Sequence, residues 1–265
     1  MHAEKVFKCF ITGLLWISFQ VVAAETAEEK GLRIAQEADV KDQGFEDSMA
    51  RVQMLLRDRN GKESMRKMRF YRKEGAGDGD KTLIVFDLPM DVQGTAMLTH
   101  SHGEKPDDQW MYLPSIKRIK RISSANQSGS FMGSEFAYED LGSPEVSKYH
   151  YLWLRDEKCG KQQTCYVYKR FPNNKHSGYT EQIVWMDTKE YRPQKIEYYD
   201  RKKALLKTLE FSDYKAYLGK FWRAHTMLMT NAQTGKATEL RWDTYKFKNG
   251  FKEKKFNNRN LKKVR

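Results

Sequence analysis

Two histidines are the residues best placed to bind a metal ion. His100 and His102 alternate in a segment that reads as a strand, so both imidazoles would lie on one face. Glu104, Asp107 or Asp108 would complete a set of nitrogen and oxygen ligands. Paired histidines at a strand end are also common without a metal. We therefore predict no metal site.

The motifs of nucleophilic catalysis are incomplete. Ser64 and Lys67 match S-x-x-K, but S-D-N, K-T-G, G-x-S-x-G and a dinucleotide-binding fingerprint are missing from the sequence. Glu135, Glu139 and Asp140 stand among aromatic residues, without a nucleophile or metal ligand nearby for acid–base chemistry. We interpret them as structural or gating residues. The sequence predicts a protein that is not an enzyme and needs no cofactor.

Residues 108–141 instead resemble a surface that binds an amphipathic ligand. Arg118 and Arg121 would pair with a phosphate or carboxylate at the mouth of a cavity. Large rings and apolar groups beside them would contact acyl chains. The candidates are Phe86, Trp110, Tyr112, Leu113, Phe131, Met132, Phe136 and Tyr138.

Two details of this surface remain open. Residues 116–122 alternate as a strand, with Arg118 and Arg121 on opposite faces, but the spacing of their isoleucines also suits a helical turn after Pro114. A solvated basic strand is the alternative to a head-group site. Gly129 and Gly133 bracket a segment that would fold over the cavity as a flexible lid, or form an ordinary surface loop.

The N-terminus has the pattern of a secretory signal peptide. Lys5 and Lys8 precede an apolar run over 10–22, and small residues lead to cleavage after Ala24. The run is shorter than the roughly 20 residues of a membrane span, although a retained anchor is the alternative. Cys9 precedes the run, so it is not a lipidated N-terminal cysteine. We expect an exported protein that is not itself lipidated.

The mature chain is strongly basic. Removal of residues 1–24 takes away two lysines and one glutamate, which lowers the formal charge from +13 to +12. An exported basic protein meets anionic lipid head groups more often than nucleic acid, so we predict an anionic membrane surface as a partner. Nine lysines or arginines in residues 246–265 would serve this contact. A frayed, solvated end over 257–265 is the alternative.

Cys159 and Cys165 flank what looks like a hairpin tip. An oxidising compartment favours a structural disulfide between them. A metal or redox pair would need C-x-x-C spacing or clustered histidines, which the sequence lacks.

The remaining pattern is mainly β, with one convincing helix over residues 28–39. Asn60-Gly61 predicts a tight turn between strands 51–57 and 63–71. Turn residues bound the other expected strands: 82–88, 94–101, 109–113, 149–155, 164–171, 180–186, 194–199, 205–211, 221–230 and 237–246. So many sequential strands imply a large antiparallel sheet, which tends to curl. Strand 82–88 is apolar on both faces, so we place it inside the sheet.

Ordered motifs over residues 30–250 resemble the LolA-like outer-membrane lipoprotein-sorting proteins. They are FDLP at 86–89 followed by GTAML at 94–98, WMYLPSIKRIKRI at 110–122, and SFMGSEFAYEDL at 130–141. The resemblance implies a strongly curved, half-open antiparallel barrel with a helical lid, whose apolar concave face receives acyl chains in the periplasm. It implies one domain over 25–250, with a basic tail at 251–265.

Composition permits such a cavity, because 12 methionines and 13% aromatic residues supply adaptable apolar surface, although they would equally fill a core. We predict a carrier that sequesters acyl chains of lipoproteins, phospholipids or fatty acids for transfer toward the outer membrane. The alternative is a non-catalytic accessory module that docks on an inner-membrane transporter.

Overall fold

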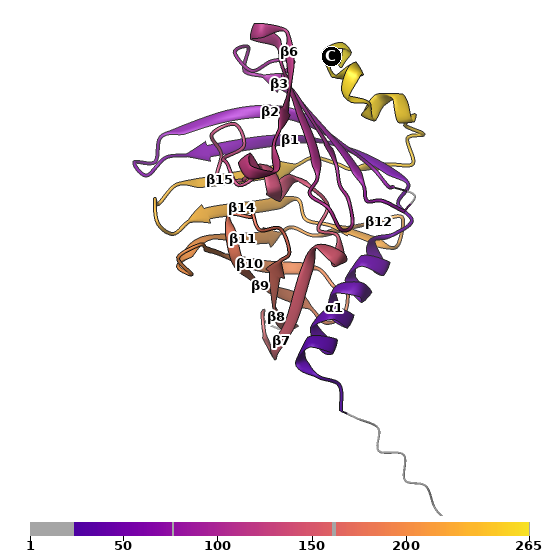
Figure 1. Ribbon diagram of the computed structural model, residues 1–265, viewed down its shortest axis with the longest axis vertical. Coiled ribbons are helices and arrows are strands. Elements are labelled where there is room, and N and C mark those ends of the chain that lie inside the picture. Colours follow the sequence, from indigo (N-terminus) through magenta and orange to yellow (C-terminus); the bar gives the residue numbers. More distant parts are fainter. Residues whose placement is uncertain (1–23, 76, 161–162, 265) are drawn as a thin grey trace, which may run out of the picture.

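A single large antiparallel sheet organises the molecule. The computed structural model describes residues 24–75, 77–160 and 163–264, so the expected signal peptide at 1–24 lies almost entirely outside the described residues. Fourteen strands follow the order β6-β5-β4-β3-β2-β1-β15-β14-β11-β10-β9-β8-β7, with β16 paired to β1. The order runs from top to bottom in Figure 1. Strands β6 and β7 stand at the two ends of this order and do not pair with each other. The curved sheet is therefore a half-open barrel, as predicted.

The strands follow the expected alternation closely. Their bounds are β1 (Asp47–Arg57), β2 (Glu63–Lys73), β3 (Lys81–Leu88), β4 (Ala96–His100), β5 (Asp108–Leu113), β6 (Arg118–Ile122), β7 (Tyr149–Lys158), β8 (Thr164–Pro172), β9 (Tyr179–Asp187), β10 (Pro193–Asp200), β11 (Leu205–Ser212), β14 (Thr226–Asn231), β15 (Ala237–Trp242) and β16 (Lys246–Phe247). The hairpin at Asn60-Gly61 is confirmed, because Arg57 pairs with Glu63 and Gly61 takes a positive φ of 81°.

Two strand predictions were wrong in their extent. Residues 221–230 divide into β13 (Phe221–Arg223), which pairs with β12 (Lys215–Tyr217), and β14. The break falls at Ala224 and His225, and the buried His225 ring is hydrogen-bonded there to the Trp242 carbonyl and the Tyr217 hydroxyl. Residues 237–246 likewise end at Trp242, and β16 begins only at Lys246.

Helix α1 (Ala27–Asp42) covers one end of the barrel's opening and confirms the predicted helix. Thr26 and Glu29 form a capping box that fixes its first turn. Ile34 is fully buried on the side that faces the sheet. Gly31 permits close approach, since an added Cβ would lie 2.9 Å from the Trp153 nitrogen in β7. No helix in the described part of the chain has the length and apolarity to cross a membrane.

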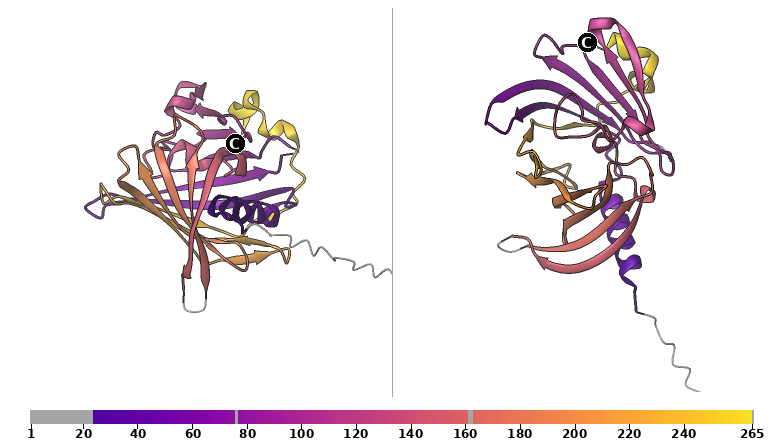
Figure 2. Two further views of the ribbon diagram at one scale, coloured as in Figure 1. Left: turned by 60° about the horizontal axis from the view of Figure 1, so that its bottom comes forward. Right: turned by 60° about the vertical axis from the view of Figure 1, so that its left-hand side comes forward.

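Residues 123–148, here called the inner segment, connect β6 to β7 across the concave face. The segment contains the short helices η2 (Ser124–Asn126), η3 (Tyr138–Leu141) and η4 (Val146–Lys148). Phe131 is fully buried and packs on Phe86 of β3, with ring centroids 5.7 Å apart. The segment lies between the two arms of the curved sheet in Figure 2. It therefore fills the part of the barrel beneath β3–β5.

The C-terminal tail covers the convex face. Its short helices η5 (Glu253–Phe256) and η6 (Asn258–Lys263) lie beside β3–β6, shown in yellow in Figure 1. Phe256 and Leu261 are 1% and 0% exposed and pack with Leu83 and Val85 of β3. Strand β3 is thus buried on both faces, as predicted. The interpretation of 257–265 as a frayed end was wrong for Leu261, which is a core residue.

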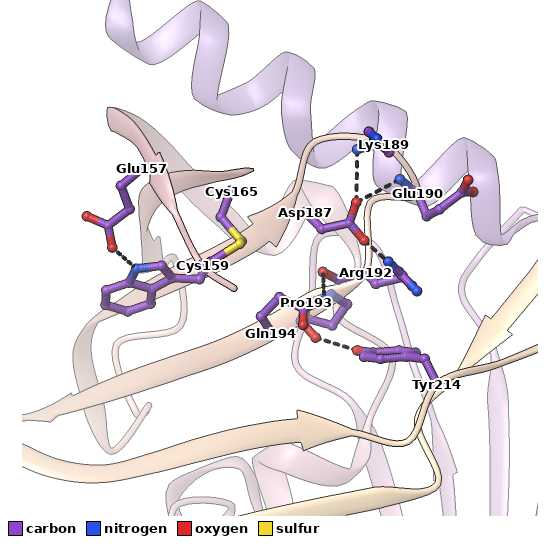
Figure 3. The surroundings of a disulfide bond; sticks show 11 residues. Glu157, Cys159, Cys165, Asp187, Lys189, Glu190, Arg192, Pro193, Gln194 and Tyr214 are labelled. Carbon is purple, nitrogen blue, oxygen red and sulfur yellow. Dashed lines mark hydrogen bonds and ion pairs between the residues drawn. A yellow bond between two sulfur atoms is a disulfide. The ribbon is translucent and has the colours of Figure 1, made fainter. Parts of the chain in front are cut away.

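The predicted disulfide between Cys159 and Cys165 joins β7 to β8 (Figure 3), with Cα atoms 5.7 Å apart. Beside it, Trp185 donates a hydrogen bond of 2.5 Å to Glu157. Asp187 accepts bonds from the backbone nitrogens of Lys189 and Glu190 and from Arg192, the last at 2.6 Å. These contacts fix the end of the sheet below α1.

Candidate ligand-binding cavity

A cavity of about 690 Å³ lies on the concave face between the sheet and the inner segment. The sheet lines it with polar side chains such as Ser48 and Arg72 and with the apolar side chains of Ala50, Phe70, Leu209, Leu240 and Trp242. These side chains come from β1, β2, β11 and β15, whose alternation points every second residue inward. The volume is in the range of binding sites for small organic ligands.

A second cavity, of about 920 Å³, lies between α1 and the sheet. Ala35 and Ala38 of α1 form part of its wall, opposite Val184 and Met186 of β9. The two cavities adjoin, because both are bounded by Arg72, Ser143, Pro144, Arg170, Ile196, Phe211, Arg223 and Met227. The interior of the barrel therefore offers two neighbouring chambers with a shared, partly basic wall.

A row of polar side chains crosses the concave face from β7 to β14. Cross-strand pairing aligns Tyr151, Arg170, Gln182, Tyr198, Lys207 and Asn231, one from each neighbouring strand. Gln182 is 3% exposed and accepts a hydrogen bond of 2.6 Å from Arg170 Nε. Burial raises the pKa of Tyr198 well above its ordinary value, so this phenol stays neutral. The row places hydrogen-bonding groups in an otherwise apolar interior.

The inner segment is attached to this row by a buried ion pair. Lys207 Nζ lies 2.7 Å from Asp140, and the two side chains are 4% and 5% exposed. Lys207 also donates to the Glu135 carbonyl at 2.8 Å, and Asn231 donates to the Glu135 carboxylate at 2.7 Å. Glu135 and Asp140 thus connect the segment to the sheet, in keeping with the first of the two roles, structural or gating, expected for them.

Two further arginines in the shared wall are paired with acids. Arg72 lies 2.6 Å from Asp80 and 3.2 Å from Asp42, and Arg223 lies 2.5 Å from Asp42. These contacts join the end of α1 to β2 and β13. Arg223 Nη2 is nevertheless buried without a hydrogen-bond partner among the described residues.

The predicted acyl-binding residues are divided between the two faces. Phe136 lines the first cavity. Phe86, Leu113, Phe131, Met132 and Tyr138 belong to the concave core but are absent from the walls of both cavities. Phe131 packs against Phe86, so the two rings cover each other inside the concave core. Contrary to the prediction, Trp110 and Tyr112 face the convex side, where the tail covers them.

Arg118 and Arg121 lie on the exposed edge strand β6, away from both cavities. We left open a strand or a helical turn after Pro114. The structure contains both, because a short helix η1 (Pro114–Ile116) precedes the strand. Arg121 forms an ion pair with Asp108 on the convex side. Arg118 pairs in register with Leu113 on the other face. The pairing of these two residues with a head group at the mouth of a cavity stays a prediction.

The histidine pair is held by the protein itself. His102 Nδ1 lies 2.8 Å from Asp78 and Nε2 lies 3.1 Å from Asp108. His100 Nε2 lies 2.7 Å from the Phe256 carbonyl in the tail. The two rings therefore have different partners and do not converge on one point.

Sequence reasoning missed Arg170 and Lys207. Both stand in strands that were predicted, at positions whose neighbours along the strand are apolar or aromatic on the same face. A lysine or arginine in phase with the core residues Tyr168 and Leu209 was the available signal.

The comparisons with known proteins agree with this architecture. A family model described as an uncharacterized protein matches residues 78–263. A solved domain from Vibrio parahaemolyticus, classed provisionally as an outer membrane lipoprotein-sorting protein domain, is 55% identical, with a TM-score of 0.87 over 89% of this chain and 99% of that chain. No curated protein sequence matches this chain.

Two other solved structures are similar at greater distance. A DUF1329 family protein from Desulfovibrio piger is 29% identical, with a TM-score of 0.83 over 89% of this chain and 99% of that one. A LolA superfamily protein from Nitrosomonas europaea is 22% identical, with a TM-score of 0.68 over 88% and 98% of the two chains, which is a likeness of fold. With 55% identity over 89% of its length, the chain belongs to the family of the outer membrane lipoprotein-sorting protein domain from Vibrio parahaemolyticus, and it shares its fold with the LolA superfamily protein.

Proposed function

We propose that this protein is a periplasmic carrier that sequesters the acyl chains of lipoproteins or lipids in its barrel. The observation that carries the proposal is the pair of adjoining cavities, of about 690 and 920 Å³, on the apolar concave face. The similarity to a lipoprotein-sorting domain supports the same class of cargo. The expected signal peptide at 1–24 and the disulfide support export to an oxidising compartment.

Binding by such a carrier needs no catalytic residue. Each buried methylene contributes about 0.8 kcal/mol, so an acyl chain is held by burial and released to a site that buries it better. The acceptor would be a membrane or a membrane transporter. The domain that would bind the cargo spans residues 25–250, and the tail at 251–264 packs on the convex side of its sheet.

The test is direct extraction of cargo. The full precursor is expressed in a Gram-negative host, and the mature protein is purified from the periplasm, extracted with organic solvent and analysed by mass spectrometry beside an unrelated exported protein. We expect phospholipid, fatty acid or acyl-peptide in near-stoichiometric amount. Met227→Trp would narrow both cavities and lower this amount, because Met227 lines each of them.

Met65→Trp is the matched control, since Met65 is 46% exposed on β2. An extract without lipid from the wild type, together with failure to take up a fluorescent fatty acid, would reject the carrier. That result would favour the alternative of an accessory module that docks on an exporter.

A further inference from the structure

Arg170 is held in a fixed orientation inside the barrel. Its Nε donates a hydrogen bond of 2.6 Å to Gln182, and its guanidinium lies over the Tyr149 ring, 4.6 Å from the centroid. Gln182 is itself almost fully buried, so the hydrogen bond attaches the Arg170 side chain to a rigid neighbour. Because Nε is occupied, the two Nη nitrogens form the free end of the guanidinium. Arg170 lines both cavities.

The charge of Arg170 is not balanced by the protein. The other arginines in the shared wall, Arg72 and Arg223, are paired with Asp42 and Asp80. Within the described ranges, Arg170 has no carboxylate within 4.0 Å, and its Nη atoms have no hydrogen-bond partner. The neighbouring Tyr168 does not compensate, because burial raises the pKa of its phenol to about 12 and keeps it neutral.

A permanent cation in an apolar chamber is unfavourable unless an anion or water satisfies it. The free end of an arginine matches the two oxygens of a carboxylate or phosphate. We propose that Arg170 binds the acidic group of the cargo, so that the protein selects acyl compounds with an anionic carboxylate or phosphate over neutral ones.

This inference rests on the proposed carrier function and adds the polarity of the cargo to it. Acyl chains would occupy the apolar walls formed by residues such as Leu209 and Leu240, while the anion would lie at the wall shared by the two chambers. Neutral acyl groups would lack this contact and be bound by burial alone.

The experiment compares three ligands with one 16-carbon chain. Delipidated mature protein is titrated with palmitate, hexadecanol and palmitoyl lysophosphatidate, using displacement of a fluorescent fatty acid. We expect wild-type protein to prefer the better of the two anions over hexadecanol by about tenfold or more, since hydrogen bonds to charged groups exceed neutral ones in strength. The tighter anion identifies whether a carboxylate or a phosphate is recognised.

Arg170→Met is expected to remove this preference and to leave hexadecanol affinity unchanged within about twofold. Arg170→Lys keeps a charge without the planar fork, and should retain part of the preference. The control is Arg51→Met, which removes an exposed arginine from β1 and should leave all affinities unchanged.

The outcomes separate the two proposals. If no ligand binds the wild type, the carrier function and this inference both fail. If hexadecanol binds as tightly as both anions, or if Arg170→Met retains the anion preference, the inference alone fails. Should Arg170→Met not fold, Arg170→Lys decides, because it keeps the charge without the planar fork and must lose part of the preference for the tighter anion.

Discussion

At the residue scale, the charged side chains inside the barrel have two different roles. Lys207 and Asp140 neutralise each other at 2.7 Å, whereas Arg170 has a hydrogen bond to a neutral amide. The first arrangement fixes the inner segment on the sheet. The second leaves a cation directed at the cavities. Lys207 and Arg170 lie in one cross-strand row, but of the two only Lys207 meets a carboxylate of the inner segment among the described residues.

The Lys207–Asp140 pair is expected to be essential for stability. Lys207→Met leaves Asp140 buried without its cation, and should lower the free energy of unfolding by about 3–5 kcal/mol. Urea denaturation followed by circular dichroism measures the change. The comparison is Arg57→Met, because Arg57 and Glu63 form an exposed pair and its loss should cost less than about 1 kcal/mol. Equal effects of the two substitutions would contradict the anchoring role.

At the element scale, the inner segment and the tail cover opposite faces of β3–β5. Phe131 of the inner segment packs on Phe86, while Phe256 and Leu261 of the tail pack beside Leu83 and Val85. The residues between Gly129 and Gly133, for which a flexible lid and an ordinary surface loop were both open, are thus partly core. The lid predicted from the resemblance is supplied at the opening by α1.

The tail is expected to be a structural part of the domain. Leu261→Ala should lower the free energy of unfolding by about 2–5 kcal/mol, since it removes a fully buried side chain from the convex core. Leu218→Ala makes the same change at a position that is 60% exposed, and should alter stability by only about 0.5 kcal/mol. Chemical denaturation of both variants gives the comparison. A stability loss no larger for Leu261→Ala would mean that the tail is not packed in solution.

At the scale of the whole molecule, basic groups collect on one exposed border. Strand β6 is the free edge of the sheet, and the tail helix η6 lies beside it. Lys117, Arg118 and Lys120 are exposed there without an ion pair among the described residues, whereas Arg121 is paired with Asp108. We infer that this border is the part of the molecule that meets anionic membranes.

Binding to anionic vesicles should test this surface. Replacing Lys117, Arg118 and Lys120 by alanine is expected to weaken binding by about 1 kcal/mol for each residue at low salt. Increasing ionic strength should weaken wild-type binding in the same way. Sedimentation with phosphatidylglycerol vesicles measures both effects. A triple alanine variant at Arg51, Arg59 and Lys62 on the β1–β2 hairpin is the control, and an equal loss there would show unspecific attraction by net charge.

Local sequence features were enough to determine most elements. Asn60-Gly61 fixed the first hairpin, because few residues adopt positive φ there at low cost. The helical pattern predicted the helix over residues 28–39, and the two-residue period defined the strands. The spacing of Cys159 and Cys165 across a hairpin indicated their disulfide. Each of these signals depends on residues that are neighbours in the chain.

The candidate site was decided by contacts between distant segments. Alternation places Trp110 and Met111 on opposite faces of β5, and both faces are apolar. The sequence pattern therefore does not tell which face is concave. That is decided by the inner segment, which packs on the Met111 face, and by the tail at 251–264, which packs on the Trp110 face. The unmatched charge of Arg170 likewise depends on Gln182 and Tyr149, brought beside it by pairing and packing. A sequence specifies which side chains share a face, whereas burial and charge balance arise only when separate segments enclose the same space.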